Sequence, residues 1–156
     1  MIDLYIRGTP RPKPAPRFIK GQRPVAIAGA LAKAWRKLVE AECKRVLRAG
    51  AKPISGALSL QGAYYFATSK AERWGQPHTM RPDIDNLTKL LQDSLKAFGI
   101  LEGDDAAIAH NGLVKLWAEE SAAVIHVRPF GVIVPSDADD DLGASTLDGA
   151  EPAPVG

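Results

Sequence analysis

Aspartates that could bind a metal ion cluster between residues 81 and 105. Asp83 and Asp85 are separated by one residue, and Asp104 and Asp105 follow further along. Residues i and i+2 of an extended chain project to the same side, and Pro82 favours an extended chain before it, so we expect Asp83 and Asp85 to aim at one point. Converging carboxylates repel each other unless a cation lies among them. Oxygen ligands suit Mg²⁺ or Mn²⁺, which can polarise a phosphoryl oxygen and generate hydroxide from water.

A helix predicted after Asp85 extends this acidic site along its polar face. Leucines recur at i, i+3 and i+4 over residues 86–98, and Gly99 ends the pattern. Opposite the leucines, one arc of about 100° carries polar residues. They are Asp85, Asn86, Lys89, Asp93 and Lys96. Because Lys89 lies one turn from Asp85, its charge could stabilise the extra negative charge of a transition state.

The same residues also have purely structural explanations. Asp85 or Asn86 can cap the helix, and Asp93 can form a surface ion pair with a neighbouring lysine. Asp104 and Asp105 can belong to a turn. The spacing of the aspartates alone therefore leaves a metal site and a capped surface helix both open.

Two other kinds of metal site do not fit the sequence. If Asp83 were position 1 of a calcium-binding EF-hand loop, position 6 would be Thr88 instead of Gly and position 12 would be Ser94 instead of Glu. One cysteine and three scattered histidines offer no spacing typical of zinc ligands.

The hydrophobic pattern predicts the elements that must position these residues. The predicted strands are 1–8, 57–68, 106–117 and 122–128, and the predicted helices are 31–48 and 86–98. The apolar face of the first helix is predicted to contain Leu31, Trp35, Leu38, Val39, Val46 and Leu47. We expect the last two strands to form a hairpin. The chain is then a single mixed α/β (α+β) domain, in which two main helices cover one face of a mixed sheet of about four strands. The other face would be solvated or covered by a second subunit.

The charge is unevenly distributed along the chain. From residue 135 to the end there are six acidic residues and no basic ones, and we expect this acidic tail, 135–156, to be disordered. Residues 1–134, the predicted domain, contain 20 basic and 12 acidic residues, a net charge of +8. A proline-rich basic segment, GTPRPKPAPRF, follows the first strand and favours an extended conformation. A body this basic suits a polyanionic partner such as a nucleic acid.

The sequence shows no sign of membrane insertion or export. No stretch approaches the roughly 18 consecutive apolar residues of a membrane span, and the N-terminus lacks the layout of a signal peptide. Cys43, the single cysteine, excludes an intrachain disulfide. We expect a cytoplasmic protein, bacterial or phage-encoded, with no membrane partner.

The segment PHTMRPDIDNLTKLLQDSLKAFGILEGDDAAIAHNGLVKLW resembles the core of RusA-type crossover-junction endodeoxyribonucleases, the RusA family of Holliday-junction resolvases. The family pattern is Lys/Arg-Pro-Asp-hydrophobic-Asp-Asn-Leu-x-Lys, then a helical Asp-x-Leu, then Gly, and then Asp-Asp opening a strand that contains a Lys. All these elements occur here in this order. The proline-rich segment is similar to the family's Gly-x-Pro-x-Pro-Lys-x-x-x-Arg. The resemblance covers about residues 3–128 and excludes the acidic tail.

The resemblance implies a homodimeric DNA endonuclease that makes paired nicks in four-way branched DNA with Mg²⁺, for which Mn²⁺ can substitute. Matched by position, Asp83, Asp85 and Asp105 are the catalytic, metal-binding carboxylates, with Lys89 near the scissile phosphate. Asp104 is the alternative to Asp105 as third ligand, and Asn86 would orient a carboxylate or a water. The residues expected to contact DNA are Arg11, Lys13, Arg17, Arg81 and Lys115.

Other functions remain open at this point. The chain could be a metal-dependent nuclease of broader substrate range, or a non-catalytic protein that binds branched DNA. The acidic set together with Lys89 favours the enzyme, because carboxylates beside phosphates give a binding protein no advantage without a metal. The acidic tail could compete with DNA for the basic surface.

Overall fold

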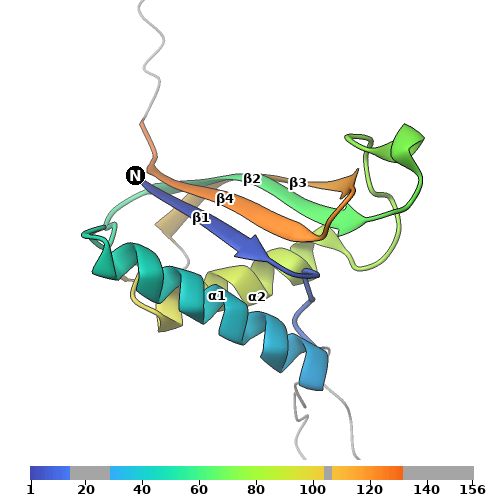
Figure 1. Ribbon diagram of the computed structural model, residues 1–156. Helices are drawn as coiled ribbons and strands as arrows, with labels where there is room; N and C mark the ends of the chain where they lie inside the picture. Colours follow the sequence, from blue (N-terminus) through green and yellow to red (C-terminus); the bar gives the residue numbers. More distant parts are fainter. Residues whose placement is uncertain (15–28, 104–106, 132–156) are drawn as a thin grey trace, which may run out of the picture.

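Four strands form one mixed sheet, and both helices cover the same face of it (Figure 1). The computed structural model describes residues 1–14, 29–103 and 107–131. The strands are β1 (Ile2–Arg7), β2 (Leu58–Ala67), β3 (Ile108–Ala118) and β4 (Ala122–Pro129); the helices are α1 (Ala30–Arg48), α2 (Ile84–Ala97) and a short 3₁₀ helix, η1 (Ala71–Arg73). The predicted mixed fold, with four strands and two main helices, is confirmed. The predicted tail lies outside the described residues, and none of the described helices is long and apolar enough to span a membrane.

The strand order is β1-β4-β2-β3, so the predicted hairpin of the last two strands is wrong. β3 runs parallel to β2, because α2 carries the chain back across the helical face before β3 begins. The connection 119–121 then takes the chain past β2, and β4 pairs antiparallel with both β2 and β1. Burial explains this order: β4 buries Ala123, Ile125 and Val127 in a central position, whereas β3 exposes His110 and Asn111 at the edge.

α1 contributes one buried stripe to the core. Its buried apolar residues are Ala32, Trp35, Val39, Cys43 and Val46, which are spaced by three or four positions. Leu31 and Leu38 were predicted on this face but are 61% and 43% exposed. Each stands one position before a stripe residue, and one position turns the side chain by about 100°. The helix therefore buries a narrower face than its leucines suggested.

Cys43 lies in the centre of this stripe. Its side chain is fully buried, and burial raises the pKa of the thiol to about 12. The group is therefore a neutral, small apolar filler of the core.

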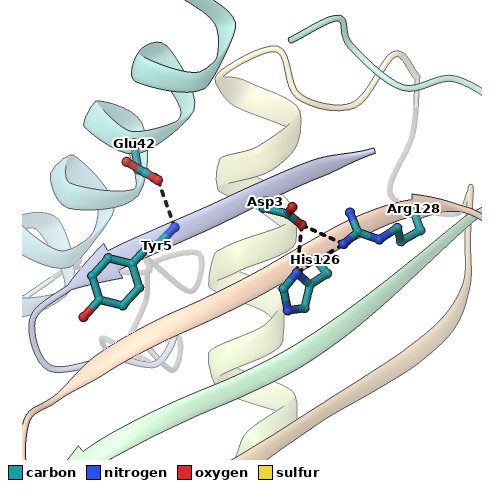
Figure 2. A network of polar contacts seen from close by, with 5 residues as sticks. All are labelled: Asp3, Tyr5, Glu42, His126 and Arg128. Carbon is teal, nitrogen blue, oxygen red and sulfur yellow. Dashed lines mark hydrogen bonds and ion pairs between the residues drawn. The ribbon is translucent and has the colours of Figure 1, made fainter. Parts of the chain in front are cut away.

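A buried carboxylate on α1 holds the outer edge of the sheet (Figure 2). β1 is an edge strand, and its Tyr5 backbone N–H donates to Glu42 Oε1 at 2.9 Å. Arg45 donates to both oxygens of the same carboxylate at 2.7 and 2.8 Å. The hydrogen bond from Arg45, with that of Tyr5, keeps the pKa of Glu42 below its usual range against the opposing effect of burial. Glu42 thus satisfies a strand donor that no neighbouring strand could reach.

On the sheet face away from the helices, a polar network joins β1 to β4 (Figure 2). Asp3 Oδ1 lies 2.8 Å from His126 Nδ1 and 2.8 Å from Arg128 Nη2. Asp3 and His126 are direct partners in the strand register. The interaction is largely exposed, so it contributes to strand register more than to stability.

We predict that Glu42→Ala lowers the free energy of unfolding by about 1–3 kcal/mol, because the Tyr5 N–H loses its acceptor. Glu42→Gln should lower it less, since the amide oxygen can still accept. Urea denaturation measures both. Glu40→Ala is the matched control: Glu40 pairs with Lys44 on the surface of α1, and because exposed ion pairs contribute little, its loss should leave the urea midpoint nearly unchanged. Equal losses for Glu42→Ala and Glu40→Ala would contradict the edge role.

Candidate functional site

The start of α2 places the two motif aspartates in different backbone environments. Asp83 is the N-cap, with extended dihedral angles of φ −71° and ψ 142°, and its side chain makes no capping hydrogen bond. The helix begins at Ile84, so Asp85 lies in its first turn. The expectation that both aspartates belong to one extended stretch is therefore wrong. The carboxylate of Asp83, which capping does not use, remains exposed and available to a ligand.

A cleft of about 520 Å³ lies between this motif and the proline-rich segment after β1. One wall is formed by Arg81, Pro82, Asp83 and Asn86, and the other by residues 9–14, with Phe66 of β2 also contributing. The Asp83 carboxylate therefore lines the same cleft as the basic residues Arg11 and Lys13. Segments far apart in sequence build one site here, which the sequence alone did not show.

Lys13 fastens the proline-rich segment to α2. Its backbone N–H donates to the Asn86 carbonyl at 2.9 Å, and its Nζ lies 2.6 Å from Asp93 Oδ2. Both side chains are nearly half exposed, so the ion pair is worth at most about 1 kcal/mol. Together the two contacts still fix where the segment crosses the helix. Arg17, the remaining basic residue predicted in this segment, lies outside the described residues.

Lys89 and Asp85 lie side by side on the exposed face of α2. Lys89 Nζ is 4.0 Å from Asp85 Oδ2, and both side chains are more than half exposed. So loose a pair leaves both groups available to a ligand. The predicted polar arc of the helix is therefore present, and Asn86 of this arc lines the cleft together with Asp83.

Lys115 holds the loop that enters the motif. Its Nζ donates to the carbonyl oxygens of Met80 and Pro82, both at 2.7 Å, across the cis Arg81–Pro82 peptide. Lys115 was predicted to contact DNA phosphates, and in the structure two of the three donors of its ammonium group are engaged by backbone. A lysine on β3 thus positions the residue before Asp83, a role that the sequence did not indicate.

His78 secures the same loop from the core side. The side chain is 5% exposed and lies between Phe66 and Trp117, with ring centroids 4.2 and 4.1 Å away, and its backbone N–H donates to the Lys115 carbonyl. Burial, together with the nearby charge of Lys115, lowers the pKa of His78. His78 is therefore a neutral packing residue and not an accessible general base.

The donors of the site suit a hard divalent cation. They are the carboxylates of Asp83 and Asp85 and the side-chain amide oxygen of Asn86, which are all oxygen ligands. Within residues 1–14, 29–103 and 107–131, no three His, Cys, Asp or Glu side chains form a metal-binding group. The predicted third ligand, Asp104 or Asp105, lies outside the described residues.

The residues that flank this predicted ligand lie at the far end of the sheet from Asp83. Gly103 follows Glu102, whose N–H donates to the Ile54 carbonyl, and β3 begins at Ile108 opposite Leu58. Asp83 instead lies near Phe66, eight residues further along β2, which is about 26 Å at 3.3 Å per residue. Two residues beyond Gly103 add at most about 7 Å of reach.

We predict that Lys115→Met loosens the loop before Asp83, because two carbonyls lose a charged donor. The free energy of unfolding should fall by about 1–3 kcal/mol. Hydrogen exchange should rise more in residues 79–87 than in α1. Lys70→Met, which removes an exposed lysine near η1, is the control and should leave both unchanged. Uniform acceleration across the protein in Lys115→Met would argue for a general packing defect instead.

Comparison with known proteins is consistent with this geometry. A search of curated proteins finds no match. The family model of endodeoxyribonuclease RusA matches residues 7–128, which include the proline-rich segment, the Asp83–Asp85 motif, Lys89 and Lys115. The match spans well over half of the chain, and both walls of the cleft fall within it. The chain therefore belongs to the RusA family of endodeoxyribonucleases.

Proposed function

We propose that this endonuclease resolves four-way DNA junctions by Mg²⁺-dependent paired nicks, with Asp83 and Asp85 as metal ligands. The observation that carries the proposal is the cleft, in which a motif carboxylate faces the cations of the proline-rich segment. Cations on one wall can hold the phosphates of a strand while carboxylates on the other hold a metal against it. Mn²⁺ should substitute for Mg²⁺, because both accept oxygen ligands.

Each residue of the site has a distinct part in this proposal. Arg11 and Arg81 bind phosphates on either side of the cleft, and Asn86 orients the carboxylates. Lys89 lies beside Asp85, where it can neutralise the charge that develops on the phosphoryl oxygens. Mg²⁺, when bound, supplies polarisation of the phosphoryl group and a water of lowered pKa. The products would carry 5′-phosphate and 3′-hydroxyl ends.

The proposal predicts Mg²⁺-dependent nicking of a labelled synthetic four-way junction at paired positions, with a linear duplex of matched sequence left intact. Asp83→Asn and Asp85→Asn should each slow nicking by at least about a hundredfold, because removing one group that stabilises the reacting phosphate has effects of this size.

Glu72→Gln is the control for these variants, since Glu72 is an exposed acidic residue of η1 outside the cleft. It should nick at the wild-type rate.

Two results would contradict the proposal. Cleavage of the linear duplex at the same rate as the junction would favour a nuclease of broader range. Tight junction binding without cleavage would favour a non-catalytic binding protein.

The third ligand leads us to propose that a homodimer completes each site. Gly103 and Ile108, which flank Asp104 and Asp105, lie at the opposite end of β2 from Asp83, and this separation supports a site that one chain does not close by itself. Two-fold symmetry would also match the symmetry of a four-way junction. We therefore assign the third carboxylate, Asp105 in preference to Asp104, to the second subunit.

The free edge of β3 suits this assembly. Residues 75–78 cover the second half of the edge through hydrogen bonds with Lys115 and Trp117, whereas residues 109–112 are exposed. A two-fold, antiparallel pairing of residues 109–112 with the same residues of a second copy would direct the segment before one β3 strand toward residues 75–78 of the other subunit. The region around Gly103 of one subunit would then approach the loop before Asp83 of its partner.

A mixed dimer tests this arrangement. We predict that Asp83→Asn and Asp105→Asn are each inactive as homodimers, whereas a dimer of one subunit of each regains junction nicking at about half the number of sites. In that mixed dimer, a site shared between subunits receives both native aspartates, while a site within one chain never does. A parallel experiment uses Asp104→Asn in place of Asp105→Asn. The ligand is the aspartate whose replacement abolishes nicking in the homodimer and is complemented in the mixed dimer. If neither mixed dimer recovers activity while both assemble, the site lies within one chain.

A further inference from the structure

The cleft continues into a groove between α1 and α2. A hollow of about 230 Å³ adjoins it and shares Lys13 and Pro14 with it. A further hollow of about 270 Å³ shares Lys33 and Arg36 with the 230 Å³ hollow. It extends to Phe98, at the end of α2. The three depressions therefore form one path along α2, from Asp83 at its start to Phe98 at its end.

The length of this path matches a short stretch of DNA backbone. Asn86 and Phe98 both line it and are separated by twelve residues of sequence, which is about 18 Å at 1.5 Å per helical residue. Successive phosphates of one DNA strand advance by about 3.4 Å along the duplex axis. The groove can therefore follow roughly five nucleotides that lead away from the acidic site.

Three cations of α1 line the groove and point the same way. Lys33, Arg36 and Lys37 are spaced i, i+3 and i+4, so they share one helix face, and all three are exposed. Arg36 lies 5.5 Å from the centroid of the Phe98 ring, which holds its guanidinium group at the groove wall.

The acidic residues of the groove already have partners of their own. Asp93 is paired with Lys13, and Glu40 is paired with Lys44, both at 2.6 Å. The hydrogen bond from Lys44 is the main reason that the pKa of Glu40 lies below its usual range, with Arg36 and Lys37 adding smaller effects. The two carboxylates are thus balanced locally, and the groove keeps a positive charge from Lys33, Arg36 and Lys37.

We propose that this basic groove, defined by Lys33, Arg36 and Lys37, binds the sugar–phosphate backbone of the DNA arm that leads away from the cleavage site. The inference rests on the proposed function, because it takes branched DNA as the substrate. A surface of cations without base-reading contacts binds phosphates irrespective of sequence. It would therefore fix the direction of the arm and leave sequence preference to the cleft.

The test measures junction affinity in EDTA at a series of KCl concentrations. The groove variant carries Lys33→Gln, Arg36→Gln and Lys37→Gln. The control variant carries Arg48→Gln, Lys52→Gln and Lys70→Gln, which removes the same charge from exposed positions outside the groove. Each lost phosphate contact should reduce the slope of log affinity against log salt by about 0.9. We expect the groove variant to lose about 2–3 units of slope on this basis and the control less than one. Circular dichroism verifies that both variants are folded.

Two results would contradict the proposal that the groove binds DNA. One is a wild-type slope in the folded groove variant. The other is an equal loss of slope in both variants, because net charge alone would then account for it. Failure of the proposed function is recognised separately, in the nicking assay. The wild-type protein would then leave the junction uncut in Mg²⁺, irrespective of how its affinity depends on salt.

Discussion

The geometry of the site depends on the two hydrogen bonds that the ammonium group of Lys115 donates. They join an edge strand to two carbonyls of the loop that leads into α2. Hydrogen bonds with a charged donor are stronger than neutral ones, and this pair spans residues 80–82, the three residues immediately before Asp83. The backbone N–H of His78 donates to the carbonyl of the same lysine, and the His78 ring packs between Phe66 and Trp117. The loop is therefore held by hydrogen bonds and by packing in the core. The contacts with β3 thus fix the position of the motif relative to the sheet, and with it the position of the first turn of α2.

Separation of charge across the cleft gives the site its chemical character. Asp83 lies at the start of α2, whereas Arg11 and Lys13 come from the chain that leaves β1; among the described residues, Arg81 is the one cation in the wall of Asp83. Had the two sets been interleaved, they would have neutralised each other as ion pairs. The loose contact of Lys89 with Asp85 is the nearest approach to such pairing at the motif. The site therefore keeps its affinity for both a metal ion and phosphates.

Local patterns in the sequence predicted the elements well, and long-range pairing poorly. The alternation in β1 and the leucine repeat of α2 gave both elements within about two residues of their observed bounds. The hairpin failed because a short connection favours pairing of neighbouring strands, whereas burial of the more apolar β4 in the sheet centre overrides that preference. Leu31 and Leu38 show the same limit on a smaller scale, since apolar character alone does not fix which side of a helix is buried.

The candidate site was predicted by residue type but not by placement. The DxDN motif and the polar arc with Lys89 were recognisable from spacing. The start of the helix at Ile84 instead of residue 86 changed the relation of Asp85 to Asp83. No local pattern could show that Lys115 would bind the Met80 and Pro82 carbonyls, because that contact depends on β3 lying beside the loop in three dimensions. The distance between Asp83 and the residues around Gly103 likewise follows only from the direction of β3.

Cys43 gives this protein a practical property. It is the single cysteine of the chain, and its thiol is fully buried with a pKa of about 12. Because the thiolate is the reactive form, a maleimide or disulfide reagent should leave the folded native chain unlabelled. A cysteine introduced at an exposed position would then be the one site that takes a fluorophore or a spin label. With two such cysteines introduced, the distance between their labels could be followed in the native background, without first removing a core residue.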